Sequence, residues 1–380
     1  MWSVGGAWRI GAIPRGLLVL AVLLLAAAGR AAEPPGLFSD ELDTDAYDCR
    51  ITLAPASRLS AAATVTLLLD WRGTNDCTRL TFTRAQCRIE TIAGGRRVLA
   101  GTAKLAVRPG APLALTVHRR GTLLGLRAGE TLLFHGAVPR AVGALAGISA
   151  DRGWTVTAAS VQRLEPVSFA DNFMRGKEES GGWITRSGDW RLASVWDDDP
   201  RGAAQRFANA IFAQNPFAWT GRAQPGANQY ALCTTGDAAW EDYTVSAAVC
   251  PRDAASVGLA VNLATPARGL LVRWSSAADR GARGNALGLY ALADGKLSLL
   301  KSVPGGCVPG QWARLSVVSS LGEVRVLVDG QERLALRTVT PWRGGVGLFV
   351  AGDGAATFDD VTVYGRALNT DLLYGEEQVS

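Results

Sequence analysis

Short runs of alternating apolar and polar residues follow one another along almost the whole chain after residue 48. Examples are TVTLLLDW (64–71), RLTFTR (79–84), LALTVHR (113–119) and VRVLVDG (324–330), separated by Gly, Pro, Asn or Asp. A period of two buries one side of a β-strand, and closely spaced strands with turn residues between them are typical of antiparallel sandwiches. Only residues 201–214 show mild helical spacing. The sequence therefore predicts an all-β fold.

The strand pattern occurs twice, with an offset near 200 residues. Pro109 and Gly110 match Pro309 and Gly310, and residues 65–71 match 257–263. An offset kept over this length indicates a domain duplication rather than a short repeat. We predict two antiparallel β-sandwich domains in tandem, over residues 33–165 and 166–366, with a linker around 163–169 and a polar tail at 367–380. The first domain is the reduced copy, because it lacks a lead-in segment and most of the tryptophans.

Residues 1–31 have the features of a secretory signal peptide. Arg9 and Arg15 precede the apolar run GLLVLAVLLLAAA (16–28), and the small residues of GRA (29–31) follow. The run is shorter than the roughly 20 residues that span a bilayer, which disfavours the alternative of an uncleaved anchor. We therefore expect a secreted or periplasmic protein with no membrane span after cleavage.

The charge pattern does not favour a nucleic-acid or anionic-membrane partner. The formal net charge is +5, and three of the 39 basic residues lie in the signal segment, which holds no acidic residue. No run of clustered Lys or Arg occurs in the remainder, where such a partner would need one.

The six cysteines do not form a metal-binding pattern. Adjacent cysteines are separated by too many residues for a Cys-x-x-Cys pair, and no histidine lies at a zinc-finger distance from any of them. The six are Cys49, Cys77, Cys87, Cys233, Cys250 and Cys307. Each predicted domain holds three, an odd number. Either one disulfide crosses between the domains or two buried thiols stay free.

The motifs of the second copy resemble a known superfamily. Their order is FADNF (169–173), GGW (181–183), GDW (188–190), WEDYTVSAAV (240–249), GLLVRW (269–274), PGQWARLSV (309–317) and GVGLFVAGDGAATFDDVTV (345–363). This order resembles the concanavalin A-like lectin/glucanase superfamily, specifically bacterial laminin-G-like and 3-keto-disaccharide-hydrolase-like (DUF1080-type) domains. The resemblance implies concanavalin A-like jelly rolls, and that fold carries lectins, glycosidases and adhesion modules alike.

Several classes of catalysis lack their residues. The only histidines, His118 and His135, lie in the first copy, so the second cannot build a Ser-His-Asp triad alone. Glycoside hydrolysis needs two carboxylates across a cleft, but the Glu-x-Asp-x-x-Glu string of the related glucanases is absent. The acidic clusters at 195–200 and 240–243 are better explained as turns. The sequence thus leans towards a non-catalytic protein.

Strand alternation predicts a sugar-binding face in the second copy. Leu259, Val261 and Leu263 share one face of their strand, which leaves Asn262 on the other. The same argument places Arg273 on the face away from its apolar neighbours. Tyr290, on the next strand, is predicted to join Asn262 and Arg273 on this polar face. Their counterparts in the first copy are predicted to be Asp70 and Thr83. The alternative is an ordinary solvated sheet face.

Trp219, in NPFAWTG (215–221), is a further candidate ligand-binding residue. Its ring could offer a platform for a sugar or close one end of the core, and the sequence does not decide between the two.

The stretch FDDV (358–361) places two carboxylates between residues that both favour the core. Strict alternation cannot bury both Phe358 and Val361, so we predict a bulge or a late strand start there. Asp359 and Asp360 could join Asp171 in a calcium site, because the first and last strands of this fold are expected to be neighbours. A hydrogen-bonded structural corner is the alternative.

These inferences favour an exported, non-catalytic protein that binds a polysaccharide or another cell-envelope glycan. A glycan-active hydrolase or lyase of the 3-keto-disaccharide hydrolase type is the first alternative. A structural or protein-interaction module is the second.

Overall fold

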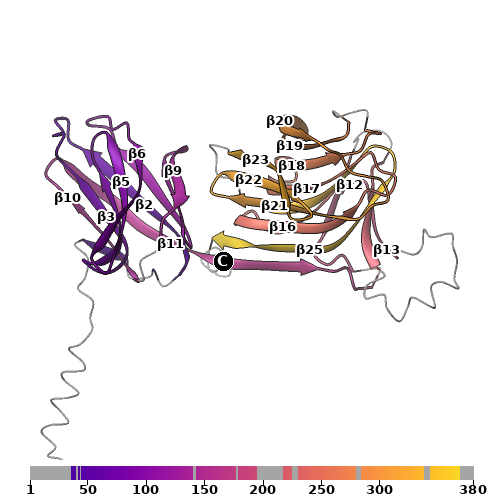
Figure 1. The fold of residues 1–380 in the computed structure, drawn as a ribbon, viewed down its shortest axis with the longest axis horizontal. Coiled ribbons are helices and arrows are strands. Elements are labelled where there is room, and N and C mark those ends of the chain that lie inside the picture. The colour runs from indigo at the N-terminus through magenta and orange to yellow at the C-terminus, as the bar shows by residue number, and fades with distance from the viewer. Residues whose placement is uncertain are drawn as a thin grey trace, which may run out of the picture. The chain divides into compact units, whose positions relative to one another are not determined.

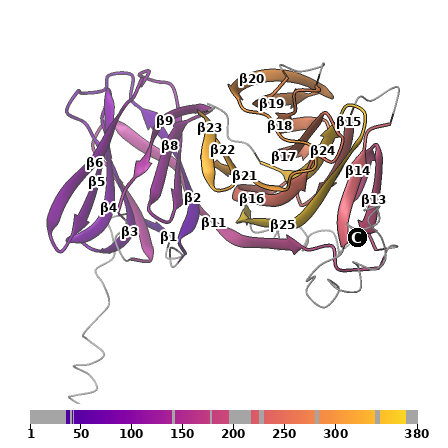
Figure 2. The same ribbon diagram turned by 45° about the vertical axis from the view of Figure 1, so that its right-hand side comes forward.

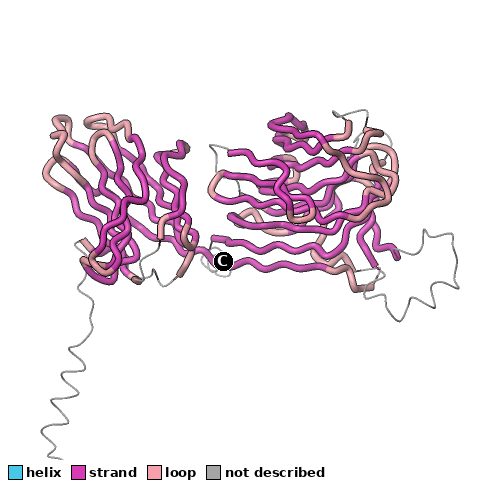
Figure 3. The backbone as a smooth tube through the Cα atoms, viewed as in Figure 1, coloured by secondary structure: helices cyan, strands magenta, loops and turns pink. Residues whose placement is uncertain are grey.

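The structure, a computed structural model, describes residues 36–39, 42, 44–139, 143–176, 179–194, 217–224, 230–279, 284–337 and 343–368. This part of the chain consists of strands and loops and contains no helix (Figure 3), which confirms the all-β antiparallel prediction. The predicted signal peptide, residues 369–380 of the predicted tail, the acidic cluster at 195–200 and the helix-like stretch at 201–214 lie outside the described residues.

Contacts between residues group the chain into two compact units. Unit 1 comprises the residues up to 43 together with 54–111 and 138–155, and unit 2 comprises 44–53, 112–137 and everything from 156 on.

Unit 1 holds a six-stranded antiparallel sheet among its described residues (Figure 1). Its order is β1 (Leu37–Ser39), β10 (Leu145–Ala150), β3 (Val65–Gly73), β4 (Asp76–Phe82), β5 (Gln86–Ala93) and β6 (Arg96–Lys104). Leu67, Leu80 and Ile89 lie side by side on adjacent strands and are fully buried. We call their side of the sheet the inner face and the opposite side the outer face.

Unit 2 contains two sheets (Figure 2). The larger has the order β23 (Gln331–Arg337), β22 (Glu323–Val328), β21 (Ala313–Ser320), β16 (Trp240–Cys250), β25 (Ala355–Leu368), β11 (Trp154–Asp171), β2 (Ala46–Pro55), β7 (Leu113–Arg120), β8 (Leu123–Ala128) and β9 (Thr131–Ala137), with β13 (Asp189–Ser194) and β14 (Phe217–Arg222) attached to β25. The smaller is seven-stranded, with the order β12 (Ile184–Ser187), β15 (Tyr230–Thr235), β24 (Gly345–Ala351), β17 (Ser256–Thr265), β18 (Arg268–Ser275), β19 (Ala286–Ala293) and β20 (Lys296–Pro304).

The main core of unit 2 lies between these two sheets. Leu259 and Val272 of the seven-stranded sheet belong to one buried cluster with Val245, Val317 and Phe358 of the larger sheet. A second buried cluster, containing Leu232, Ala260, Leu271 and Phe349, occupies the opposite side of the seven-stranded sheet. The inner face of this sheet is thus the side of Leu259, and its outer face is the side of Leu271.

The strand order repeats as the duplicated sequence pattern leads one to expect. The run β10-β3-β4-β5-β6 recurs as β24-β17-β18-β19-β20, and β2-β7-β8-β9 recurs as β16-β21-β22-β23. The registers agree as well, because Leu115 lies opposite Ala128 just as Leu315 lies opposite Val328.

The segment predicted as a linker, residues 163–169, forms regular structure instead. It lies within β11, which continues to Asp171 and pairs with β25 along its second half, from Leu164 to Asp171. Pro166 is tolerated there although it lacks an N–H, and the predicted boundary near residue 165 falls inside a strand.

None of the six cysteines is paired, so neither predicted disulfide arrangement is found. Neighbouring thiols are kept apart by the sheet, since Cys87 pairs with the inner-face residue Phe82 while Cys77 pairs with the outer-face residue Ile92. Burial raises the pKa of Cys233 to about 11 and that of Cys307 to about 12.

The bulge predicted at FDDV is present. Ser246 lies opposite Thr362 while Ala248 lies opposite Asp359, so β25 carries one extra residue there. Asp360 takes up the left-handed backbone conformation (φ +47°), and Phe358 and Val361 both reach the core. The extra residue reverses the alternation, which is how both apolar side chains are buried.

Candidate functional site

The outer face of the seven-stranded sheet carries Arg273 and Tyr290, two of the predicted ligand-binding residues. Arg273 lies opposite Gly258 on one neighbouring strand and opposite Gly288 on the other. Leu271 and Tyr290 form the next pair of the same face. Strand alternation therefore located these two side chains correctly.

Arg273 is the centre of a polar cluster on this otherwise apolar face. Its Nη2 donates to Asp279 Oδ2 at 2.6 Å and its Nε donates to Ser256 Oγ at 3.0 Å. Burial alone would raise the pKa of Asp279, but hydrogen bonds from Ser256 and Ser275 and the charge of Arg273 outweigh burial and lower it. The pair is thus ionised and close to neutral in total charge.

Two hydrogen-bonding groups of this cluster remain available. Among the described residues, neither Arg273 Nη1 nor the hydroxyl of Tyr290 has a hydrogen-bond partner, and the Arg273 side chain is 13% exposed. A Cβ atom at Gly288 would lie 2.7 Å from Tyr290 Cε2 and 3.2 Å from its hydroxyl oxygen. The ring therefore lies over the glycine, which is the cross-strand partner of Arg273, and only a residue without a side chain fits beneath it.

Asn262 does not lie on this face. It is fully buried, and its Nδ2 donates to Ser319 Oγ of β21 at 2.7 Å, across the core. The register of β17 shifts between Val261 and Thr265, and Asn262 adopts φ +53°. This bulge turns the side chain to the inner side, which simple alternation did not anticipate.

Trp219 also lies in the core rather than on a ligand surface. It is 7% exposed and stacks on Phe173 with ring centroids 6.0 Å apart, and the Arg175 guanidinium lies 5.4 Å from its ring. Its partner across the ladder is the core residue Phe358, so the strand register fixes the ring inside.

The three residues of the predicted calcium site are neighbours but do not converge. Asp171 lies opposite Val361, next to the acidic pair, as expected for first and last strands. Its carboxylate already accepts hydrogen bonds from the Phe173 N–H, the Arg175 guanidinium and the Trp183 indole. No group of three or more His, Cys, Asp or Glu in the described part of the chain could hold a metal ion.

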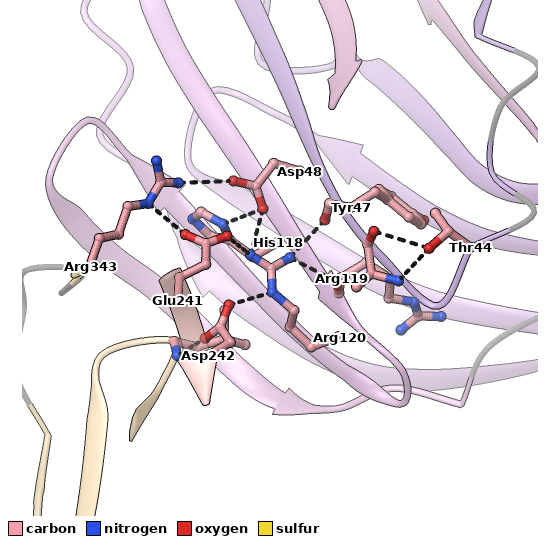
Figure 4. A network of polar contacts seen from close by, with 11 residues as sticks. Thr44, Tyr47, Asp48, His118, Arg119, Arg120, Glu241, Asp242 and Arg343 are labelled. Carbon is pink, nitrogen blue, oxygen red and sulfur yellow. Dashed lines mark hydrogen bonds and ion pairs between the residues drawn. The ribbon is translucent and has the colours of Figure 1, made fainter. Parts of the chain in front are cut away.

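A buried cluster of charged residues, which the sequence did not reveal, lies elsewhere in unit 2 (Figure 4). Arg120 at the end of β7 donates to Asp48 Oδ1 at 2.9 Å, to Glu241 Oε1 at 2.8 Å and to Asp242. Arg343 forms ion pairs with the same Glu241 at 2.5 Å and with Asp48 at 3.6 Å. Three carboxylates thus share two guanidinium groups.

His118 completes this cluster. Its Nδ1 lies 2.9 Å from Asp48 Oδ1, and its Nε2 has no hydrogen-bond partner among the described residues. Burial opposes ionisation of Asp48, but the hydrogen bond from His118 and the charge of Arg120 keep its pKa below the ordinary value. Burial and the nearby charge of Asp48 raise the pKa of Glu241.

The cavity beside His118 is too small for a substrate. It measures about 50 Å³ and is lined by His118, Arg120, Arg127, Glu241, Asp242, Ser319, Leu321, Gly322 and Arg343. An engineered cavity of about 150 Å³ is large enough for benzene, so this smaller space suits a few waters and not a sugar ring. The Asp48–His118 pair therefore has the hydrogen bond of a catalytic dyad but lies beside a cavity of this small size.

Comparisons with known proteins return matches among solved structures. No protein-family model matches the chain, and no curated protein matches it. Among solved structures, the chain is similar to the carbohydrate-binding module CBM66 from Bacillus subtilis, with 16% identity over 48% of this chain and 94% of that one and a TM-score of 0.35. It is also similar to a Bacillus subtilis protein of unknown function with a galectin-like fold (12% identity, 53% and 96% covered, TM-score 0.36) and to sheep galectin-11 (17%, 33% and 96%, 0.28).

Among the described residues, no helix is long and apolar enough to cross a membrane.

Proposed function

We propose that the protein binds a neutral glycan on the outer face of the seven-stranded sheet and does not act on it chemically. The observation that carries this proposal is the Arg273–Asp279 ion pair beside the Tyr290 ring. Sugars present hydroxyl groups on their edges and C–H groups on their faces. The Arg273 guanidinium offers a donor, the Tyr290 hydroxyl offers a donor or an acceptor, and the Tyr290 ring offers a stacking surface for these groups.

The charge of the cluster supports a neutral ligand. Asp279 offsets the charge of Arg273, so an acidic sugar would find no excess positive charge there. Arg273 Nη1 and the Tyr290 hydroxyl can still bond to sugar hydroxyls.

The same geometry argues against hydrolysis. Cleavage of a glycosidic bond needs two carboxyl groups, one of them protonated to act as a general acid. Asp279 is the carboxylate that contacts Arg273, and its lowered pKa leaves it ionised and unable to donate a proton. The alternative of a hydrolase therefore has less support than glycan binding.

A glycan array followed by calorimetry on the strongest neutral hit tests the proposal. Tyr290→Ala removes the ring and should weaken binding at least about tenfold, which corresponds to about 1.4 kcal/mol. Arg325→Ala is a matched control, since this exposed residue lies on β22 of the other sheet. Equal affinity of wild type and Tyr290→Ala for every bound glycan would reject this face as the site, and Arg273→Ala provides an independent second variant.

A further inference from the structure

The outer face of the six-stranded sheet in unit 1 carries four basic side chains that are far apart in the sequence. Arg79 lies opposite Glu90, Arg88 opposite Thr81 and Thr102, Arg97 opposite Ile92, and Lys104 opposite Gln86. The residues that alternate with them, such as Leu80, Phe82, Cys87 and Ile89, are fully buried on the inner face. Strand alternation therefore directs all four cationic side chains outwards.

Little negative charge opposes these cations. Glu90 is the acidic residue among the described outward positions of β4, β5 and β6, and it pairs with Arg88 at 3.0 Å. Arg79 has no ion pair, and its buried Nε has no hydrogen-bond partner in the described part of the chain. The outward charge of β4, β5 and β6 is therefore mainly positive, which favours an anionic ligand.

The spacing of the cations favours a polymer over a small anion. Arg97 pairs with Ile92, which lies four residues after Arg88 along β5. The positions of the two arginines are therefore roughly 13 Å apart along the strand, at about 3.3 Å per residue. A single phosphate or monosaccharide cannot contact both ends of such a row. A chain with anionic groups at intervals can.

The remaining outward residues favour a polysaccharide over other polyanions. Thr81 and Thr102 lie opposite Arg88 on its two neighbouring strands, and Thr66 lies opposite Thr81. Their hydroxyl groups can bond to sugar hydroxyls. Single-stranded nucleic acids are usually held by exposed aromatic rings, and the aromatic residue of this face, Trp71, is only 3% exposed.

We propose that the outer face of the six-stranded sheet is a second binding surface, which takes an acidic polysaccharide bearing carboxylate or sulfate groups. This surface is separate from the proposed neutral-glycan site, and either can exist without the other.

The test measures binding of the full chain to heparin, polygalacturonate and neutral dextran at 50 and 250 mM salt. We expect binding to at least one acidic polymer, with affinity that falls at least fivefold at the higher salt because exposed charges are screened. The triple variant R79Q/R88Q/R97Q should lose at least tenfold in that affinity. The control R191Q/R325Q/R337Q carries the same change in net charge on strands of unit 2 and should retain it.

Three outcomes overturn the proposal: no binding to either acidic polymer, an equal loss in both triple variants, or tighter binding to single-stranded DNA or to anionic phospholipid vesicles. Thermal melting of both triple variants confirms that they are folded. Tyr290→Ala should bind the acidic polymer as the wild type does, so failure of the neutral-glycan site leaves this result unaffected.

Discussion

The outer faces of the six-stranded and seven-stranded sheets share a strand order and a register but differ in chemistry. The strand registers identify the equivalent positions. Across the inner face of the six-stranded sheet, one row of paired residues is Ile148, Leu67, Leu80 and Ile89. The equivalent row of the seven-stranded sheet is Leu348, Leu259, Val272 and Leu289. On the outer side, Ser149 corresponds to Phe349, Thr66 to Gly258, Thr81 to Arg273, Arg88 to Gly288 and Glu90 to Tyr290. The register thus assigns Thr81, and not the predicted Thr83, as the counterpart of Arg273.

Backbone irregularities are retained although the outward side chains have changed. Asp70 and Asn262 occupy equivalent positions and have nearly the same left-handed backbone, with φ of +49° and +53°. The hairpins β5–β6 and β19–β20 also shift register at the same place, between Ile89 and Glu90 and between Leu289 and Tyr290. Burial of the inner face constrains register in both copies, whereas the outer face is free to acquire one ligand chemistry or another.

The largest effect is expected at a position where the first copy has an arginine and the second has a serine. Arg120 occupies the position that Ser320 occupies in the second copy, since Val117 and Val317 are equivalent. Arg120→Ser takes the Arg120 charge from Asp242 and leaves Asp48 and Glu241 with Arg343 alone, and breaking a buried ion pair typically costs about 3–5 kcal/mol. Chemical denaturation should show this loss in the free energy of unfolding.

Ser320→Ala is the matched control and should change the stability by less than about 0.5 kcal/mol. An equal loss of stability in both variants would mean that Arg120 contributes through packing rather than through its ion pairs with the three carboxylates.

A second prediction transfers a residue from one face to the other. Gly288→Arg introduces the counterpart residue Arg88 beneath the Tyr290 ring, where even a Cβ atom approaches the ring to 2.7 Å. The ring must move, so affinity for the neutral glycan should fall at least about tenfold, or 1.4 kcal/mol, while binding of the acidic polymer should persist or increase. Calorimetry with both ligands measures this, and unchanged neutral-glycan affinity would contradict the importance of the ring position.

The third prediction concerns the shared bulge. Asn262→Ala removes the hydrogen bond to Ser319, worth about 1 kcal/mol, and places a Cβ-bearing residue without a local hydrogen bond in a left-handed conformation, at about 1 kcal/mol more. Asn262→Gly loses the hydrogen bond alone. Urea denaturation should therefore show Asn262→Gly to be more stable than Asn262→Ala, the reverse of the usual order of these residues in a strand. The usual order would show that the stability of the bulge does not depend on the φ angle of residue 262.

The sequence predicted the all-β class, and strand alternation located Arg273 and Tyr290, because their strands are regular. It failed at Asn262, where one extra residue in the strand reverses the face of every following side chain. The signal was present in the chain, since Asn and Asp tolerate left-handed backbone and Asp70 occupies the matching position. The bulge at FDDV was predictable because Phe358 and Val361 both required burial.

Two charged features could not be found by inspecting neighbours in the sequence. Arg79, Arg88 and Arg97 are nine residues apart and form no basic run, so only the hairpin registers bring them to one face. Asp48 and His118 are 70 residues apart and meet because β2 pairs with β7. Such pairs depend on strand partners, which single-sequence patterns do not specify.

The smallest predicted effect returns to the closing strand of the second copy, which has an acidic pair. The sequence of this strand matches VTAASVQRL (156–164) in the first copy, where Ala159 and Ser160 stand in place of the pair. Burial, together with the charges of Asp360 and Asp171, raises the pKa of Asp359 to about 6 from an ordinary value of 3.8. The folded protein therefore binds more protons than the unfolded chain between these values, and its stability falls as the pH rises from about 4 to 6.

Asp359→Asn removes this penalty and keeps an acceptor for the Asp360 N–H. Because Asp359 is only half-buried, the gain should stay below about 1 kcal/mol. Melting temperatures of variant and wild type should separate progressively between pH 4 and 6 and then differ by a constant amount, whereas Asp294→Asn, in an exposed turn, should follow the wild type throughout. A difference that is already complete at pH 4 would show that Asp359 acts through its shape rather than its charge.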